Sequence, residues 1–179
     1  MVLVVLLFPS LALGGEVKWK DLVMQDGLYY KKFTDVIFTG KVTGKYQGSF
    51  RKGKKHGPWV RYWKNGQLRT KGTYKDGKID GDWVRYWENG QLYFEGTYKN
   101  GKEDGPYVTY YDNGQLWMKG TYKDGKKDGL WVSYWSDGQL STKGNWKDKT
   151  IDGPWVSYWS DGTVDEDLTG TYKNGVKVK

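Results

Sequence analysis

Carboxylates are the side chains of this 179-residue chain whose types and spacing come closest to a reactive site. Asp165, Glu166 and Asp167 form one acidic run, and a pair of carboxylates can act as general acid and base. Four more carboxylates recur at regular spacing, each directly before a glycine: Asp80, Asp104, Asp128 and Asp152. An acidic run in a loop is more often a solvated surface, and Asp before Gly is typical of a turn or a capped strand end. We expect no catalytic carboxylate pair.

A metal site is not favoured either. Asp124 and Asp128 stand on either side of Gly125, but a calcium loop needs acidic residues at alternating positions and a closing bidentate Glu, and neither follows. The absence of cysteine excludes disulfides and thiolate chemistry. His56, the single histidine, holds the position that Asp80 takes in the next repeat, which indicates a turn residue. We expect no metal, no cofactor and no enzymatic activity.

These side chains belong to a repeat with a period of 24 residues. The motif Gly-x-(Trp/Tyr)-Val-x-Tyr-(Trp/Tyr) begins at Gly57, Gly81, Gly105, Gly129 and Gly153. Each repeat contains two short aromatic and β-branched runs, such as 59–63 and 67–74, which are typical of strands. We therefore predict an all-β fold, an elongated single-layer antiparallel meander of β-hairpin repeats.

Turn chemistry supports the hairpins. The sequences Asn65-Gly66 and Asp76-Gly77, and their equivalents along the chain, favour two-residue type I′ turns because both residues tolerate positive φ. Asp148-Lys149 lacks the glycine, so we expect a looser turn or one of another type there.

The loop length decides which residues face each other across the first full hairpin. A two-residue Asn-Gly loop pairs Trp63 with Leu68 and Trp59 with Gly72, so that an indole covers a residue without a side chain. A three-residue loop that ends in a left-handed glycine with a bulge would instead set Trp63 opposite Gln67 and Trp59 opposite Lys71. We favour the first register and keep the second as the alternative.

Strand alternation then divides the side chains between two faces of the sheet. One face carries the structural residues of the repeat, which are Trp59, Trp83, Tyr107, Trp131, Trp155, Gly72, Gly96, Gly120 and Gly144. The other carries Arg69 and Lys71 and a ladder of tyrosines, Tyr62, Tyr86, Tyr110, Tyr134 and Tyr158. We predict that this second set is an interaction surface.

The N-terminal part of the chain differs from the repeats. Residues 1–14 contain an uncharged run of about 12 apolar residues, which is short for a bilayer span of roughly 20 and fits a signal peptide. No Lys or Arg precedes this run, so an upstream start, a retained anchor and a buried strand stay open as alternatives. We predict a signal peptide at 1–14, a divergent cap at 15–47 and the repeat array at 48–179, and hence an exported protein in the periplasm, the cell envelope or the extracellular space.

Positive charge is concentrated near the N-terminus. The chain has a net charge of +8, and residues 16–80 hold sixteen Lys and Arg against six Asp and Glu. The densest basic patch is Arg51, Lys52, Lys54 and Lys55. Such a patch can attract anionic lipid or an acidic protein face, and it can also serve only as a solubilising surface.

The recurring pattern DGxWVxYWxNGQLxxxGTYKDGK resembles the MORN-repeat family, and more closely its bacterial variant in YwqK-type antitoxins. The resemblance covers about residues 28–179. It implies β-hairpin repeats, no catalytic residues and a scaffold for protein or membrane contact. The antitoxin label implies neutralisation of a partner protein.

We therefore expect an exported, non-enzymatic scaffold that binds an unidentified protein partner. The alternatives are a module that stacks cell-wall glycan on its aromatic rows and a module that binds an anionic membrane surface through its basic end. Nucleic acid is the least favoured partner, because export removes it from reach. The open edges of the sheet could also pair two copies into a dimer.

Overall fold

The computed structural model describes residues 15–178, so the predicted signal peptide lies outside the described residues. Fourteen strands form one open sheet, and β2 and β3 form a separate two-stranded sheet. The strands are β1 (Val17–Lys18), β2 (Leu22–Gln25), β3 (Leu28–Lys31), β4 (Gly40–Thr43), β5 (Tyr46–Arg51), β6 (Lys54–Tyr62), β7 (Leu68–Lys75), β8 (Lys78–Tyr86), β9 (Leu92–Lys99), β10 (Lys102–Tyr110), β11 (Leu116–Lys123), β12 (Lys126–Tyr134), β13 (Leu140–Lys147), β14 (Thr150–Ser157), β15 (Gly170–Lys173) and β16 (Val176–Lys177). A single 3-10 turn, η1 (Trp19–Asp21), follows β1.

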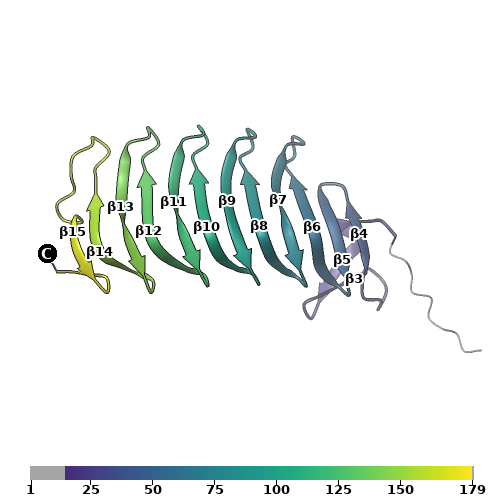
Figure 1. The fold of residues 1–179 in the computed structure, drawn as a ribbon. Coiled ribbons are helices and arrows are strands. Elements are labelled where there is room, and N and C mark those ends of the chain that lie inside the picture. The colour runs from purple at the N-terminus through teal and green to yellow at the C-terminus, as the bar shows by residue number, and fades with distance from the viewer. Residues whose placement is uncertain (1–14, 179) are drawn as a thin grey trace, which may run out of the picture.

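The large sheet is a meander. From β4 to β16 each strand pairs antiparallel with the next one in the chain, and Figure 1 shows these strands side by side in one row. The predicted single-layer antiparallel meander is confirmed. At the N-terminal edge β1 pairs with β4 in parallel, which the repeat pattern did not predict. No helix within residues 15–178 has the length and apolar character needed to cross a membrane.

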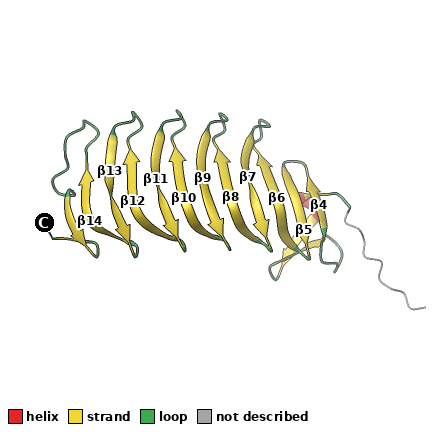
Figure 2. Cartoon of the chain, viewed as in Figure 1, coloured by secondary structure: helices red, strands yellow, loops and turns green. Residues whose placement is uncertain are grey.

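The Asp-Gly and Asn-Gly turns at one rim of the sheet have the predicted geometry (Figure 2). Asp76 and Gly77 have φ of 50° and 89°, and Lys75 pairs with Lys78 across them. A two-residue turn with positive φ at both positions is a type I′ turn. Lys149 also adopts a positive φ, of 77°, within a closed two-residue turn. The looser turn predicted there is wrong, because strand pairing forces a lysine into the position that glycine holds elsewhere.

The turns at the opposite rim contain three residues, not the predicted two. The Trp63 N–H donates to the Gln67 carbonyl at 2.8 Å, and the Gly66 N–H donates to the Trp63 carbonyl at 3.2 Å. The Asn65 carboxamide oxygen accepts the N–H of Gln67 at 3.0 Å. This side-chain turn stabilises Asn65 at negative φ and leaves positive φ to Gly66 alone.

A β-bulge corrects the register that the longer loop would shift. Leu68 pairs with Tyr62 instead of Trp63, and Arg69 is left without a partner before pairing resumes at Thr70. The predicted pairing of Trp63 with Leu68 is therefore wrong. Because the bulge absorbs one residue, the predicted register returns in the strand interior.

The glycines lie beneath aromatic rings, with one difference from the prediction. Trp59 pairs with Gly72 as predicted, and Gly72 also pairs with Trp83 on its other side. Only one of the two rings covers Gly72, and it is that of Trp83, because a methyl group at Gly72 would overlap the Trp83 ring. The Trp59 ring covers Gly48 of the strand on its other side. Each indole thus covers the glycine of the preceding strand, as Trp131 does Gly120 and Trp155 does Gly144.

One repeat departs from this arrangement. The glycine of β9, Gly96, is approached by Phe94 of its own strand. Phe94 is buried and its ring lies 5.0 Å from that of Tyr107. Tyr107 stands where the other repeats have Trp and has a smaller ring, so Phe94 fills the remaining space.

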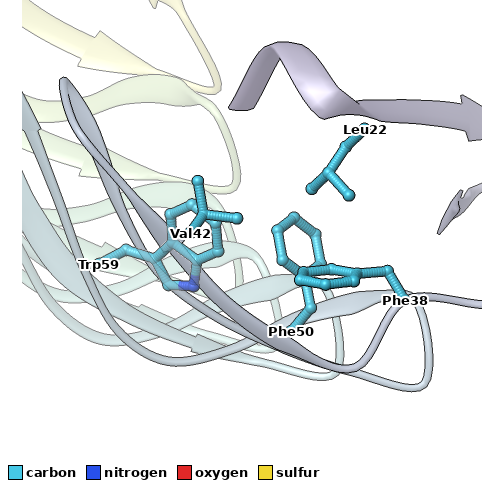
Figure 3. Packing of buried hydrophobic residues seen from close by; sticks show 5 residues of the cluster. All are labelled: Leu22, Phe38, Val42, Phe50 and Trp59. Carbon is cyan, nitrogen blue, oxygen red and sulfur yellow. The ribbon is translucent and has the colours of Figure 1, made fainter. Parts of the chain in front are cut away.

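Residues 15–47 cover one end of the sheet. Leu22, Phe38 and Val42 form a buried cluster with Phe50 and Trp59 (Figure 3). Trp19 adds a ring 5.2 Å from Tyr46. The N-terminal segment thus caps the first repeat with a small apolar core, since a terminal repeat has no neighbour to bury its ring.

Candidate functional site

The sheet has two different faces. The aromatic face carries the repeated Trp59, Trp83, Tyr107, Trp131 and Trp155 together with the rings of the neighbouring strands, such as Tyr74. The Val–Tyr face carries Val60, Val84, Val108, Val132 and Val156 and the predicted tyrosine ladder, Tyr62, Tyr86, Tyr110, Tyr134 and Tyr158.

The aromatic face serves mainly as the core of the array. Trp59, Trp83 and Trp131 are 5%, 7% and 2% exposed. Tyr74 stands between two of them, with ring centroids 5.9 Å from Trp59 and 5.3 Å from Trp83 and near-perpendicular planes. Such edge-to-face contacts join the repeats along the sheet. These three indoles have no open ring face on which a sugar could stack.

The Val–Tyr face is not covered by a second layer in the described part of the chain (Figure 1). Shallow grooves cross it between the side chains of neighbouring strands. One groove of ≈ 270 Å³ lies at Gly96 between Val84 and Val108. Another of ≈ 360 Å³ lies at Gly144 beside Val156 and Leu130, which is 50% exposed. These grooves are of a size to take side chains of another molecule.

The tyrosines of this face are half-buried. The Tyr110 hydroxyl donates to Glu95 Oε1 at 3.3 Å. Burial, together with the Glu95 carboxylate, raises the pKa of Tyr110. The ladder therefore offers hydroxyl groups beside a valine row, with the exposed Lys71 and Glu95 on the same face.

Arg69 does not lie with the tyrosines. It is the extra residue of the β-bulge, and its guanidinium lies over the Trp63 ring at 4.1 Å. It lines the same hollow of the aromatic face as Trp59 and Arg61. The predicted grouping of Arg69 with the Val–Tyr face is wrong, because a bulge interrupts the alternation of side chains.

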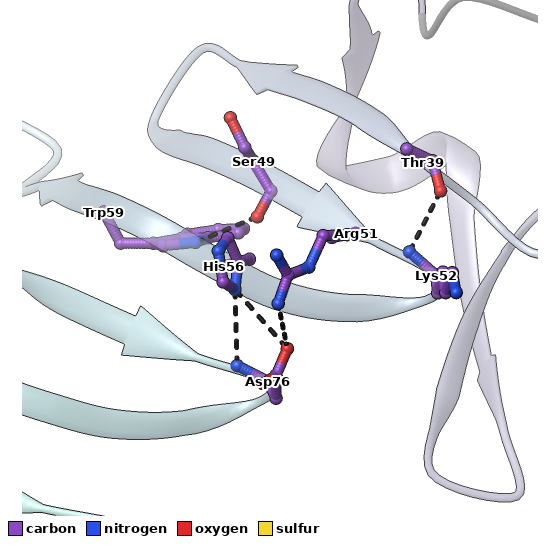
Figure 4. A network of polar contacts seen from close by, with 7 residues as sticks. All are labelled: Thr39, Ser49, Arg51, Lys52, His56, Trp59 and Asp76. Carbon is purple, nitrogen blue, oxygen red and sulfur yellow. Dashed lines mark hydrogen bonds and ion pairs between the residues drawn. The ribbon is translucent and has the colours of Figure 1, made fainter.

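The predicted basic patch is not one surface. Arg51 donates to Asp76 at 2.7 Å (Figure 4), and this hydrogen bond lowers the pKa of Asp76. Lys52 lies in the turn, where its N–H donates to the Thr39 hydroxyl. Lys54 points to solvent, whereas the Lys55 ammonium lies over the Trp59 ring at 4.9 Å.

His56 and the repeated aspartates have the predicted capping role where the structure gives their contacts. His56 Nδ1 accepts the N–H of Asp76 at 3.5 Å, and Asp80 accepts the N–H of Asn100 at 3.0 Å. Each side chain thereby joins its strand to the following turn. Asp152 does the same for Asn174 at 3.4 Å.

The acidic run is a structured loop. Asp165 is 6% exposed and its Oδ1 accepts the N–H groups of Asp167 and Leu168 at 3.1 and 3.2 Å. Across residues 15–178, no three His, Asp or Glu side chains come together as a metal site.

The sequence-based reasoning missed a cluster of cations on the aromatic face. Lys55, Arg61, Arg69 and Arg85 line one hollow over β6, β7 and β8. Arg61 and Arg85 stand at the same position of two successive repeats, where later repeats have Thr109 and Ser133. The presence of arginine at this position in the first two repeats, and its replacement in later ones, was the sequence signal that could have indicated the cluster.

The comparison with known families agrees with this architecture. Residues 55–76, 79–100, 103–124 and 127–148 each match the MORN repeat variant. The chain belongs to the MORN repeat variant family. Membership indicates a repeat scaffold for protein or membrane binding, and it confirms the predicted resemblance at the level of the family.

This MORN repeat protein continues its repeat geometry beyond the matched stretches. Trp155 of β14 pairs with Gly170 of β15, as Trp59 does with Gly72. A comparison with curated proteins finds no match. The YwqK-type antitoxin assignment stays a prediction.

Proposed function

We propose that this MORN repeat protein is an exported, non-enzymatic scaffold that binds a protein partner with its Val–Tyr face. The observation that carries the proposal is the open state of this face from β6 to β14 (Figure 1). The valines and tyrosines of this face have no covering layer and are partly exposed, except Val132, which is 7% exposed; an accessible row of apolar and aromatic side chains is typical of an interaction surface. Tyrosine suits such a surface, since its ring packs while its hydroxyl donates.

The grooves at Gly96 and Gly144 support a protein partner over a flat membrane surface. Each groove combines apolar side chains, Val84 and Val108 in one case and Leu130 and Val156 in the other, with charged ones, Glu95 and Lys143 respectively. A protein segment laid across the strands can place side chains in successive grooves. Neutralisation of a toxin, as the antitoxin resemblance implies, is one form that such binding would take.

Affinity capture from cells that produce the full tagged chain tests this function. The test variant replaces Tyr86, Tyr110 and Tyr134 with Ser. The control variant replaces Tyr93 and Trp117 with Ser at the bulge position, where a later repeat already has Ser141. We expect one protein to be recovered in stoichiometric amount with the wild type and the control, and to be lost with the test variant.

Two further measurements complete the test. Far-UV circular dichroism and the melting temperature must show that the tyrosine variant is folded. Equal recovery of the partner by the folded tyrosine variant would remove the Val–Tyr face from the function. The mass of the protein recovered outside the cytoplasm tests export, which predicts a chain beginning near Gly15; a full-length intracellular chain would contradict it.

A further inference from the structure

A hollow of ≈ 340 Å³ lies on the aromatic face over β6, β7 and β8, beside the N-terminal cap. We call it the arginine hollow. Four cations and two indoles line it, together with other residues, and none of its lining residues is acidic: the six are Lys55, Arg61, Arg69, Arg85, Trp59 and Trp83. The hollow concentrates positive charge between low-dielectric aromatic walls, an arrangement that strengthens the field felt by an anion.

The cations of the arginine hollow have no counter-ion in the described part of the chain. Within residues 15–178 the one ion pair between a carboxylate and a Lys or Arg side chain joins Asp76 and Arg51. The guanidinium groups rest against rings instead, Arg61 at 4.7 Å from Tyr46 and Arg69 at 4.1 Å from Trp63. A ring face attracts a cation but offers no lone pair to its N–H groups, so these donors stay available.

Two buried donors in the hollow also lack an acceptor. Arg61 Nε and Trp83 Nε1 are buried and have no hydrogen-bond partner; Trp131 Nε1 and Trp146 Nε1, outside the hollow, share this state, so Arg61 Nε is the one of these donors particular to the hollow. A buried donor without a partner is unfavourable and normally has a structural or ligand-binding explanation. Burial and the positive charge of Arg61 lower the pKa of Lys55. A negatively charged acceptor in the hollow would favour the charged form of Lys55 and offer a partner to the Arg61 guanidinium.

Other repeats adopt the same backbone geometry without these arginines. The position of Arg61 and Arg85 is occupied by Thr109, Ser133 and Ser157 in the following repeats, on the same backbone geometry. Lys55 corresponds to Ile79, and Arg69 to Ser141 in the fourth matched repeat. The cations therefore gather in the first repeats for a reason other than repeat architecture.

The arrangement suits a tetrahedral oxyanion. Arg61 and Arg85 both pair with Thr70, one from each side, so their backbones are roughly 10 Å apart, which is two strand spacings. A group between them can accept hydrogen bonds from both guanidiniums, whose forked donors match phosphate oxygens. We propose that the arginine hollow binds a phosphate monoester. Such a group carries a charge near −2 at neutral pH and three acceptor oxygens, and the hollow leaves room beside the indoles for the organic group attached to it.

This site is separate from the proposed protein interface, since it lies on the opposite face of the sheet. Failure of either proposal would leave the other in place.

Titration calorimetry of the full chain with phenyl phosphate tests the site. The test variant combines Arg61→Thr, Arg69→Ser and Arg85→Ser, all residue types that other repeats carry at these positions. The control variant, Lys75→Ser with Lys99→Ser and Lys123→Ser, removes the same charge from exposed strand ends. We expect saturable binding to the wild type, an affinity lower by about tenfold or more in the test variant, and a change within about twofold in the control.

Flotation with phosphatidylcholine vesicles containing phosphatidic acid identifies the source of the phosphate. Vesicle binding that the test variant loses and phenyl phosphate displaces assigns a lipid-borne monoester. Binding of phenyl phosphate without vesicle binding assigns a soluble one. The proposal is overturned if phenyl phosphate does not saturate the wild type, or if the two variants, both folded by melting temperature, lose affinity equally.

Discussion

Substitution of Gly120 by alanine isolates the contact that orders the repeats. Gly120 has no positive φ, so its backbone conformation is acceptable for alanine. A methyl group at this position would overlap the ring of Trp131, and all three atoms nearest to it belong to that ring. Trp131 is 2% exposed and is held by Tyr122 at 5.1 Å. Overpacking of a filled core costs about 1–3 kcal/mol, and the restriction of the unfolded chain by alanine returns roughly 0.5–1 kcal/mol. We expect a net loss of about 1–2 kcal/mol in the free energy of unfolding.

A double-mutant cycle measured by urea denaturation and far-UV circular dichroism checks this reasoning. Trp131→Ala alone should cost about 3–5 kcal/mol. With the ring removed, Gly120→Ala should no longer be unfavourable and should be neutral or stabilising by roughly 0.5 kcal/mol. Additive losses in the double variant would refute the account, because they would show that the glycine is needed by the backbone and not by the indole.

Three further changes have signs set by single contacts. Lys149→Gly should raise the free energy of unfolding by about 1 kcal/mol in urea titration, since it relieves a positive φ of 77°; an unchanged midpoint would contradict this. Asp137→Asn should raise the free energy of unfolding by roughly 0.5 kcal/mol. The equivalent Asn113 donates at 2.8 Å to a carbonyl 23 residues further on, and an aspartate cannot donate this hydrogen bond. A loss of stability would contradict the stabilising role of this hydrogen bond between repeats. Burial, and then the charge of Glu103, raise the pKa of Tyr98 to about 12 from 10.0. The neutral Tyr98 hydroxyl therefore contributes fully to the free energy of unfolding below pH 10.0, and this contribution disappears as the pH rises toward 12. Tyr98→Phe should remove roughly 1 kcal/mol of that alkaline loss, the partial exposure of the ring allowed for, and an identical pH profile would count against it.

The period and the turn residues made most of the fold predictable. Glycine at steps of 24 and aromatic strands between turns predict hairpins without a structure. The pairing of Trp59 with Gly72 was predicted from a two-residue loop, and it holds because the bulge at Arg69 compensates for the third loop residue. The loop length did not follow, because Asn-Gly supports both two- and three-residue turns. The Asn65 side chain decides between them by accepting the Gln67 N–H.

The sites were less predictable than the fold. A bulge at Arg69 moves that side chain to the aromatic face, and no local residue type marks it. The cation cluster combines residues of three strands, so it needs the register as well as the composition. The parallel strand β1 arises from packing of the cap on Phe50 and Trp59, a long-range contact outside the repeat pattern.

Site-specific photocrosslinking in cells tests the central claim, the Val–Tyr face as the binding surface, most directly. A benzophenone amino acid at Leu130, 50% exposed on the Val–Tyr face, is compared with one at Trp117, 38% exposed at a bulge of the aromatic face. We predict a discrete crosslinked adduct of one partner from position 130 and none from position 117. An adduct from position 117 alone, or equal adducts from both, would contradict the claim.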